Sequence, residues 1–498
     1  MQSQYHLHIG GEQRPARSGE TLPVENPATG EPVTEVAVAG PEDVDDAVRA
    51  ANEAFKDGRW SRQTGRDRAR VLQQAARGLE DRLDEFAQNE TMQIGRPLRE
   101  MRAQLRRAPE WFEYFGSLAH TVEGTVPDFD ADHINYVRRV PLGVVGLITP
   151  WNHPLLILMK KLSAALAAGN SVVIKPSEFG PVAALEIART LEDAGLPPGV
   201  VNVVTGYGAG TGRALTEHPT IAKLDLTGGT ETGRAVAAAA GRNLIPVAAE
   251  LGGKAAVVVF NDTDPEVAAA GAAFAAFIAT GQVCIQGSRL LVQQEIYDDV
   301  VSSFIDRANS LRVGDPLDPG TQLGPLASAP QLERVTGGVD AARDEGANIA
   351  CGGARLTESP LDRGYYYAPT VMGDVTPKMD VWHEEIFGPV TIATPFKDEA
   401  EAIELTNDAR YGLAASVWTR DVARAHRVVN AIDAGILWIN DHHRIDPASP
   451  WSGRKDSGIG QENGVDGYKA YTAPKSIIVN TSDEPFDWYA STEEMRYS

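Results

Sequence analysis

Cysteine, positive charge and long apolar runs are all scarce in this chain of 498 residues. Two cysteines cannot build a disulfide framework, so the reducing cytoplasm is the expected location. Lys and Arg number 46 against 68 Asp and Glu, a net charge of -22. Such a surface repels phosphate backbones and acidic lipid, so we expect no nucleic-acid or membrane partner. We also expect no signal peptide and no membrane helix, because no uncharged apolar run reaches the required roughly 18 to 20 residues.

The order of the predicted elements indicates several domains. The first 120 residues are predicted to be mainly helical: Pro41 opens one helix, and a second apolar stripe covers residues 71–86. From residue 143, short apolar strands alternate with helices. The strand candidates are residues 144–149, 171–175, 201–204, 222–227 and 245–248. A second alternating series covers residues 255–440, so we predict two α/β domains with parallel sheets buried on both faces.

One of the two cysteines has a setting suited to chemistry. Cys284 lies in GQVCIQGSR, between a predicted buried helix at residues 265–280 and a predicted strand at residues 288–293. A cysteine near apolar residues is usually a small core side chain. A cysteine between a helix and a strand can instead be held at the bottom of a cleft, and the other motifs favour this interpretation.

Two of these motifs carry groups that can assist a nucleophile. Asn152 follows the first strand and can donate its amide to a developing oxyanion, or it can simply form a turn before a proline. Glu250, in ELGGK, can act as a general base for chemistry at Cys284 if it is close and partly desolvated. A glutamate in a solvated turn is the alternative interpretation.

Three further motifs are typical of nucleotide binding. Lys175 and Glu178 follow the second strand and can hold ribose hydroxyls, or they form a solvated turn. Residues 206–212 are glycine-rich but fail the dinucleotide fingerprint, because Thr211 stands where its last glycine is required. TGGTETG at residues 227–233 precedes a helix, as a pyrophosphate site does, although a purely structural turn has the same pattern.

Taken together, these motifs resemble those of the NAD(P)-dependent aldehyde dehydrogenase superfamily. The resemblance spans residues 26–471 and rests on seven motifs in the family's order. These are TPWNHP (149–154), KPSE (175–178), LTGGTETG (226–233), ELGGK (250–254), GQVCIQGSR (281–289), EEIFGPV (384–390) and SGIGQE (457–462).

The resemblance implies two doubly wound parallel-sheet domains and a small β oligomerisation arm. The NAD-binding domain would comprise residues 1–119 and 143–252, and the catalytic domain residues 253–456. Residues 120–142 and 472–498 would form the arm and the C-terminal tail. Such an arm implies a homodimer or a homotetramer.

The resemblance also implies a mechanism. Cys284 attacks the aldehyde, Asn152 holds the alkoxide, hydride passes to the nicotinamide, and Glu250 activates the water that hydrolyses the thioester. Lys161 joins the catalytic set, Glu462 is a proton relay, and no metal ligand is assigned. A free thiol has a pKa of about 8.5, so nearby dipoles or N–H groups are expected to favour the thiolate. Covalent attack comes first because hydride leaves an alkoxide more readily than a carbonyl.

NAD is the cofactor that the resemblance implies. The residues assigned to it are Thr149, Pro150, Trp151, Lys175, Ser177, Glu178, Gly208, Thr227, Gly228, Gly229, Gly233, Leu251, Glu385 and Phe387. The Glu178 carboxylate would accept a hydrogen bond from the ribose and repel the 2′-phosphate of NADP, so NAD is the preferred form. Gly229 departs from the serine most common in the family, which should weaken cofactor binding only modestly.

The aldehyde is a small molecule whose identity the motifs leave open. The residues assigned to its pocket are His153, Ile157, Lys160, Val283, Ile285, His443 and Arg444. Basic side chains at 160, 442, 443 and 444 would attract an acidic semialdehyde, unless they face solvent or bond to Asp441 and Asp446. An aromatic or aliphatic aldehyde is the default.

Other activities are compatible with the same architecture. A CoA-acylating semialdehyde dehydrogenase passes its thioester to coenzyme A, but such enzymes generally lack the glutamate that matches Glu250. A non-catalytic binding protein has no chemical need to keep Cys284, Glu250 and Asn152 together. Esterase activity through the same thiol is a plausible side reaction.

Overall fold

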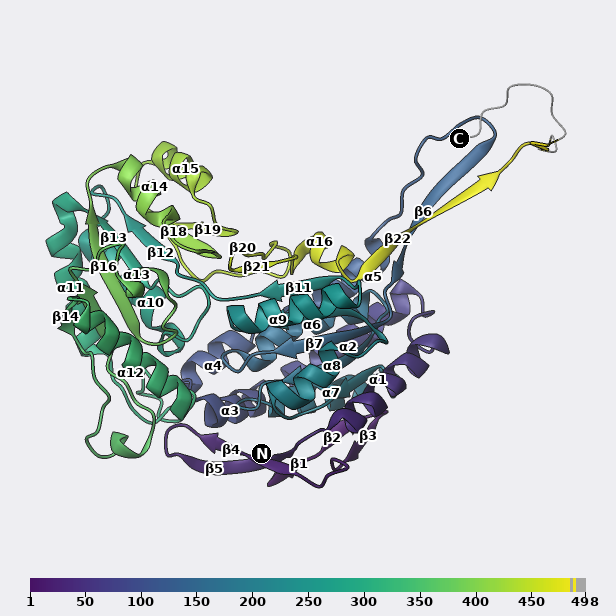
Figure 1. Ribbon diagram of the computed structural model, residues 1–498, viewed down its shortest axis with the longest axis horizontal. Coiled ribbons are helices and arrows are strands. Elements are labelled where there is room, and N and C mark those ends of the chain that lie inside the picture. Colours follow the sequence, from purple (N-terminus) through teal and green to yellow (C-terminus); the bar gives the residue numbers. More distant parts are fainter. Residues whose placement is uncertain (484–486, 490–498) are drawn as a thin grey trace.

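The computed structural model describes residues 1–483 and 487–489, which form two sheet-centred bodies and a projecting arm (Figure 1). The first sheet has eight strands. In spatial order they are β21 (Gly458–Ile459), β11 (Val247–Glu250), β10 (Ile221–Thr227), β7 (Val144–Thr149), β8 (Ser171–Pro176), β9 (Val201–Val203), β2 (Leu7–Ile9) and β3 (Glu12–Arg14). The five central strands pair in parallel, and β21, β2 and β3 add antiparallel edges.

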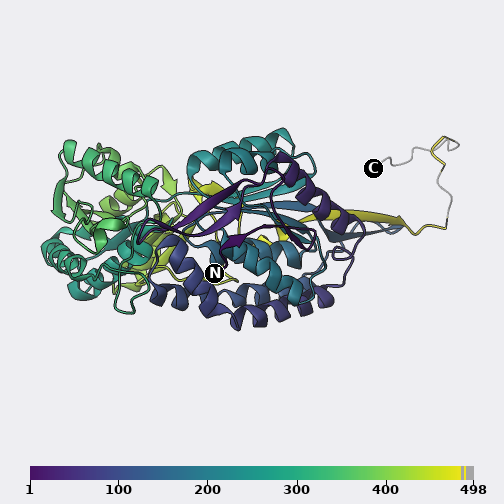
Figure 2. The same ribbon diagram turned by 90° about the horizontal axis from the view of Figure 1, so that it is seen from below.

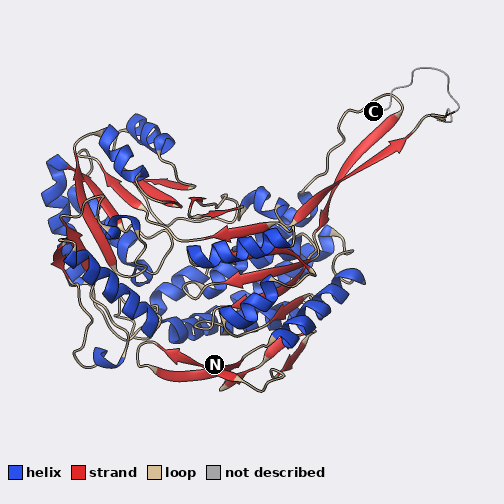
Figure 3. Ribbon diagram, viewed as in Figure 1, coloured by secondary structure: helices blue, strands red, loops and turns tan. Residues whose placement is uncertain are grey.

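Helices cover both faces of this sheet (Figure 3). One face packs against α2 (Gly65–Glu80), α5 (Pro109–Thr121), α6 (Pro154–Ala167) and α7 (Val182–Asp193). The other packs against α1 (Pro41–Lys56), α8 (Arg213–Thr216) and α9 (Thr230–Arg242). Strand β7 shows why: Val144 joins the core on one face and Val145 the core on the other. Apolar residues at every position of a strand require cover on both sides.

The second sheet repeats this plan. Its seven strands, in spatial order, are β14 (Asn348–Cys351), β15 (Thr370–Gly373), β16 (Val390–Phe396), β13 (Arg289–Gln293), β12 (Ala256–Val259), β18 (Ala414–Trp418) and β19 (Ile436–Ile439). On one face lie α10 (Pro265–Phe277) and α11 (Tyr297–Ser310). On the other lie α12 (Ala329–Asp344), α13 (Asp380–His383), α14 (Glu399–Asn407) and α15 (Val422–Ala431). The predicted pair of doubly wound α/β sheets is thus confirmed.

The arm is built from two segments that are far apart in the sequence. Strand β6 (His133–Pro141) pairs antiparallel with β22 (Thr472–Asn480), and the ribbon extends away from the body (Figure 2). Ile134 and Ile478 are more than half exposed there. Most of the predicted tail, residues 484–486 and 490–498, lies outside the described residues. The predicted oligomerisation role and domain boundaries remain predictions.

The N-terminal region is less helical than its sequence suggests. Besides β2 and β3 it contains a three-stranded sheet of β1 (Gln4–Tyr5), β5 (Glu31–Ala37) and β4 (Thr21–Asn26). In β4 the buried residues Leu22 and Val24 alternate with exposed ones, but Pro23 between them obscures the strand pattern. The apolar stripe at residues 71–86 spans two helices, because Arg82 leaves helical geometry between α2 and α3 (Leu83–Ile94).

The remaining elements are short. They are α4 (Leu98–Leu105), α16 (Gly464–Lys469), strands β17 (Tyr411–Gly412) and β20 (Arg454–Lys455), the π-helical turn η1 (Gly208–Gly212), and the 3₁₀ turns η2 (Ile278–Gly281), η3 (Gln294–Ile296) and η4 (Leu361–Arg363). Across residues 1–483 and 487–489, no helix combines the length and apolar character needed to cross a membrane.

Candidate active site

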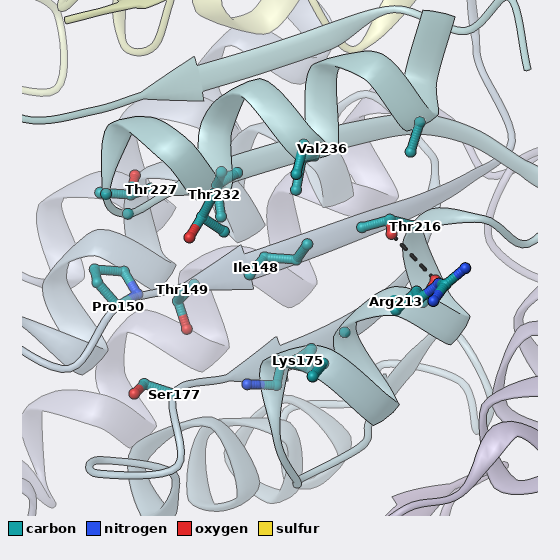
Figure 4. Close-up of a pocket in the computed structure, with 18 of the residues that line it drawn as sticks. Ile148, Thr149, Pro150, Lys175, Ser177, Arg213, Thr216, Thr227, Thr232 and Val236 are labelled. Carbon is teal, nitrogen blue, oxygen red and sulfur yellow. Dashed lines mark hydrogen bonds between the residues drawn. The ribbon is translucent and has the colours of Figure 1, made fainter. Parts of the chain in front are cut away.

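A cleft of about 600 Å³ opens where the strand order of the first sheet reverses. The chain proceeds from β7 to β8 and β9 on one side, then returns to add β10 and β11 on the other. Ligands of open α/β sheets bind at such a switch point, beyond the carboxyl ends of the strands. The predicted cofactor residues that line the cleft are Thr149, Pro150, Trp151, Lys175, Ser177, Glu178, Gly208, Thr227, Gly228 and Gly229 (Figure 4).

The turn between β10 and α9 suits an anionic group. Gly229 is the N-cap of α9, and its helix has no side-chain cap, so the first N–H groups are left for another acceptor. A Cβ built on Gly229 would meet no atom within 4 Å, so the turn borders open space. Thr227 Oγ1 is buried and has no hydrogen-bond partner in the described part of the chain. Free N–H groups, a positive helix end and an unpaired hydroxyl together fit a phosphate.

A lysine and a carboxylate lie at the opposite wall, after β8. Lys175 Nζ is 3.4 Å from Glu178 Oε2, and burial lowers the pKa of Lys175. Lys175 and Ser177 both face the cleft (Figure 4). An ammonium, a hydroxyl and a carboxylate at one strand end provide the donors and acceptors that ribose hydroxyls require.

One predicted cofactor residue lies elsewhere, and several residues that line the cleft were missed, among them two apolar ones. Gly233 does not line the cleft: a Cβ there would lie 2.3 Å from Leu251 Cδ2, so the glycine allows α9 to pack closely on the end of β11. Ile148 on β7 and Val236 on α9 form apolar walls of the cleft (Figure 4). Two sequence features indicate Ile148 and Val236. Side chains of β7 alternate between the two faces of the sheet, and Val236 is one helical turn after Thr232.

A second, smaller pocket continues from this cleft to Cys284. It is lined by Trp151, Asn152, Gly229, Leu251, Cys284, Glu385 and Phe387, among others. The rings of Trp151 and Phe387 meet edge to face with centroids 5.4 Å apart. Glu385 Oε1 accepts a hydrogen bond from the N–H of Gly253 at 2.9 Å, and burial raises the pKa of Glu385 to about 7. The predicted residues Leu251, Glu385 and Phe387 thus lie beside the thiol.

A tight reversal of the chain holds Cys284. Helix α10 ends at Phe277, earlier than predicted, and Ala279, Thr280 and Gly281 all take left-handed backbone angles. A Cβ on Gly281 would lie 2.1 Å from Gly388 O, so only glycine fits. The reversal brings the chain from the end of a buried helix to the start of β13 and leaves the thiol at the base of the pocket.

Two predicted partners of the thiol lie close to it. Asn152 Nδ2 donates to Gln282 O at 2.8 Å, which ties the amide to the loop that carries Cys284. Glu250 ends β11, two residues later than the predicted strand end, and the chain then passes so near Cys284 that a Cβ on Gly253 would lie 2.1 Å from its carbonyl oxygen. Neither carboxyl oxygen of Glu250 has a hydrogen-bond partner among the described residues.

The electrostatics of the thiol differ from the expectation. Burial raises the pKa of Cys284 to about 12, against the pull of the Lys160 ammonium. The predicted bias toward the thiolate is therefore wrong for this form of the protein. Burial also raises the pKa of Glu250 well above its usual range, and the negative charge of Glu462 adds to this effect. Glu250 is close enough for its charge to raise the pKa of Cys284, and a thiol and a carboxyl group that interact in this way are suited to proton transfer.

Lys161 lies in a buried network behind the pocket. Its ammonium donates to Asp225 Oδ1 at 2.5 Å and to Glu462 Oε1, and Tyr471 donates to the other oxygen of Asp225 at 2.6 Å. Burial works to lower the pKa of Lys161, but the two carboxylates raise it overall. Lys161 lines neither pocket beside Cys284. Its contacts show that it holds Glu462, and its predicted catalytic role stays a prediction.

A further pocket lies on the other side of Cys284. Its predicted residues are His153, Ile157, Lys160, Val283, Ile285 and His443, and the ones that were missed are Gln104, Leu156, Ile445 and Trp451. Arg444 does not line it: the side chain is 81% exposed and pairs with Asp441 at 3.0 Å. Its placement in the pocket was wrong because neighbours in an irregular loop can face opposite ways. Trp451 is far in the sequence from Cys284, and no local pattern indicates that it lies in this pocket.

The histidines of this loop carry no charge at neutral pH. Burial lowers the pKa of His442 to about 4 and that of His443 to about 3. His442 is bonded to Ser416 Oγ at 3.1 Å and to Ile285 O at 2.8 Å, which makes it a structural residue. Of the basic groups expected to attract an acidic aldehyde, Lys160 and His443 line the pocket, and His443 is neutral because burial lowers its pKa.

Comparison with known proteins gives the same picture. The family model described as the aldehyde dehydrogenase family matches residues 14–477. Betaine aldehyde dehydrogenase 1 of Oryza sativa subsp. japonica is 40% identical, with 97% of each chain covered. The crystal structure of a betaine aldehyde dehydrogenase from Staphylococcus aureus in complex with NAD⁺ superposes with a TM-score of 0.96 at 35% identity, covering 98% of this chain and 97% of the other.

A third relative supports the same assignment. The structure of PnpE in complex with nicotinamide adenine dinucleotide gives a TM-score of 0.95 at 42% identity and covers 97% of this chain and 99% of the other. These matches extend over nearly the whole sequence rather than over one motif. The chain therefore belongs to the aldehyde dehydrogenase family, and it is an oxidoreductase that acts on aldehydes.

Proposed function

We propose that the protein oxidises an aldehyde to its carboxylic acid with NAD, through a thioester on Cys284. One observation carries the proposal: Cys284 lines two pockets at once. The first continues into the cleft at the switch point of the nucleotide-binding sheet, and the second is largely apolar. A thiol between these pockets can hold a substrate carbon beside a bound nicotinamide.

The residues divide the chemistry among them. Glu250 takes the thiol proton as Cys284 sulfur bonds to the aldehyde carbon. The resulting alkoxide accepts hydrogen bonds from Asn152, whose amide has a second N–H, and from the backbone N–H at Cys284. Such a donor contributes about 3 kcal/mol. Bound NAD supplies the acceptor for the hydride that converts this adduct to a thioester. Glu250 passes the thiol proton to solvent and then deprotonates a water whose oxygen bonds to the acyl carbon; the carbon–sulfur bond breaks, the acid leaves, and the proton on Glu250 returns to the sulfur.

The same arrangement disfavours the alternatives. A non-catalytic protein has no need of a buried carboxylate with two unpaired oxygens beside a thiol, because such a group is costly to bury. Glu250 also supports hydrolysis over transfer to coenzyme A. With a panel of aldehydes, we expect NADH and acid in equal amounts, at a rate that does not change when CoA is omitted. A strict CoA requirement, or no NADH from any aldehyde, would contradict the proposal.

The preference for NAD over NADP rests on Glu178. Its carboxylate is held near Lys175 at the ribose end of the cleft, where it would repel a 2′-phosphate. We expect Glu178→Gln to raise the ratio of kcat/KM for NADP to that for NAD about tenfold. Glu333→Gln, on the exposed face of α12, is the matched control and should leave the ratio unchanged. An equal ratio in wild type and Glu178→Gln would show that Glu178 does not set the preference for NAD over NADP.

The quaternary structure and location follow from the arm and the composition. The exposed apolar residues of β6 and β22, among them Ile134 and Ile478, suit contact with a second copy of the chain. This supports a homodimer or a homotetramer. The scarcity of cysteine supports a cytoplasmic location.

A further inference from the structure

We propose that the Lys160 ammonium selects the substrate: it covers the aromatic face that a cationic aldehyde would need, and it favours aldehydes with a carboxylate at the far end. The inference rests on the proposed function, because it names the substrate class of the pocket next to Cys284. It also separates this chain from relatives named for betaine aldehyde, whose trimethylammonium group is a permanent cation.

The first observation is an ammonium without acceptors. Lys160, on α6, is 5% exposed and lines the aldehyde pocket together with Cys284. Its Nζ makes no hydrogen bond and no ion pair within residues 1–483 and 487–489. An ammonium has three donors, and those of Lys160 open onto the pocket rather than onto a protein acceptor. Such a group fits a pocket whose ligand brings the acceptor.

The neighbouring residue shows that this arrangement is not general to buried lysines here. Lys161 is fully buried, yet its ammonium contacts two carboxylates. Consecutive residues of a helix point in different directions, so Lys161 faces the network of Asp225 and Glu462 while Lys160 faces the pocket. Burial lowers the pKa of Lys160, and the negative charge of Glu462 opposes this effect. A bound carboxylate would stabilise the protonated form further.

The second observation is that Lys160 already covers the aromatic ring of the pocket. Its Nζ is 3.7 Å from the centroid of the Trp451 ring. An aromatic face in this position is the feature that proteins use to bind quaternary ammonium groups. In this chain a trimethylammonium group would meet a like charge where it needs the ring. No acidic side chain of the described residues lines the pocket to compensate.

The rest of the pocket agrees with an acceptor-bearing ligand. Both ring nitrogens of His153 and Nε2 of His443 are buried and have no hydrogen-bond partner among the described residues. Burial lowers the pKa of both rings, so each is neutral and offers one N–H donor. Ile157, Val283 and other apolar residues provide the remaining walls. The polar groups can thus hold a carboxylate while the walls contact a short carbon chain.

Two matched pairs of aldehydes test the proposal. Betaine aldehyde is compared with tert-butylacetaldehyde, which has carbon in place of the charged nitrogen, and succinic semialdehyde is compared with pentanal. We expect the wild-type enzyme to have a kcat/KM at least about tenfold higher for tert-butylacetaldehyde than for betaine aldehyde, and higher for succinic semialdehyde than for pentanal.

Variants of Lys160 should change these ratios in opposite directions. Lys160→Met should raise the ratio of betaine aldehyde to tert-butylacetaldehyde about tenfold and lower the ratio of succinic semialdehyde to pentanal by a similar factor. Lys160→Arg should keep the wild-type order. Adding Trp451→Leu to Lys160→Met should remove the gain for betaine aldehyde. Lys378→Met, which removes an exposed lysine far from the pocket, should leave both ratios unchanged.

The ratios separate this inference from the proposed function. Each ratio compares substrates within one variant, so a general loss of kcat, for example through a changed Cys284 pKa, cancels. Unchanged ratios in Lys160→Met, or a wild-type preference for betaine aldehyde, would overturn the inference while aldehyde oxidation stands. No NADH from any of the four aldehydes would overturn both. If Lys160→Met does not fold, Lys160→Gln makes the same comparison.

Discussion

Replacing Cys284 with alanine is expected to lower kcat for aldehyde oxidation about 10⁴-fold or more while the affinity for NAD stays within about twofold of wild type. The reason is that the variant loses the atom that bonds to the substrate. The cleft for the cofactor is formed by other residues, on β7, β8, β10 and α9. Initial rates of NADH formation and a titration of NAD by protein fluorescence measure the two quantities.

The chain contains its own control for this variant. Cys351, at the end of β14, is the other free cysteine, and it lies in the second sheet, outside the pockets that contain Cys284. Cys351→Ala should therefore keep wild-type activity. Substantial oxidation by Cys284→Ala, or a loss in both variants, would show that the reaction does not depend on the sulfur of Cys284.

Replacing Glu250 with glutamine is expected to separate acylation from hydrolysis. Glutamine keeps the shape of the side chain but cannot deprotonate a water, so we expect steady-state turnover to fall about 10²- to 10⁴-fold. Acylation needs the thiol to lose its proton only once, and in the variant solvent takes that proton in place of Glu250, so the first turnover still forms the thioester. Rapid mixing should therefore show a burst of at most one NADH per active site, followed by a slow phase. A variant with wild-type turnover would exclude Glu250 as the base.

The pH dependence of the same step follows from the burial of Glu250. Burial and the charge of Glu462 raise the pKa of this carboxyl well above its usual range. A base works only in its deprotonated form, so hydrolysis in the wild-type enzyme should speed up as pH rises through this raised pKa. The Glu250→Gln variant should lack that rise in its slow phase.

The sequence predicts those parts of the site that depend on local chain direction. Asn152 follows β7 and Glu250 ends β11, and the carboxyl ends of such buried parallel strands meet at one edge of the sheet. The apolar runs of β7, β8 and β10 predict the doubly wound architecture for the same reason, because they need cover on both faces. These conclusions require only the spacing of apolar residues along the chain and the position of a residue relative to the end of a strand.

The parts that could not be predicted depend on contacts between distant segments. Lys160 and Lys161 are adjacent lysines that no sequence pattern distinguishes. In the structure Lys160 faces Trp451, whereas Lys161 faces Asp225 and Glu462. The sequence also does not show how deeply Cys284 is buried. Its pKa, expected to be lowered, is therefore raised.

Loops and short strands were the other source of error. His443 and Arg444 are neighbours, yet His443 faces the pocket and Arg444 faces solvent. An irregular loop has no period that would tell the two apart. In the N-terminal region, strands such as β1 and β3 have only two or three residues, too few to show alternation.

Mass spectrometry of the acylated enzyme tests the central claim most directly. Glu250→Gln is mixed with an aldehyde and NAD⁺, quenched in acid during the slow phase, and digested. The account predicts that the peptide containing Cys284 gains the mass of one acyl group, that the peptide containing Cys351 does not, and that the gain requires NAD⁺. A burst of NADH without acyl mass on Cys284, or acyl mass on another residue, would contradict it.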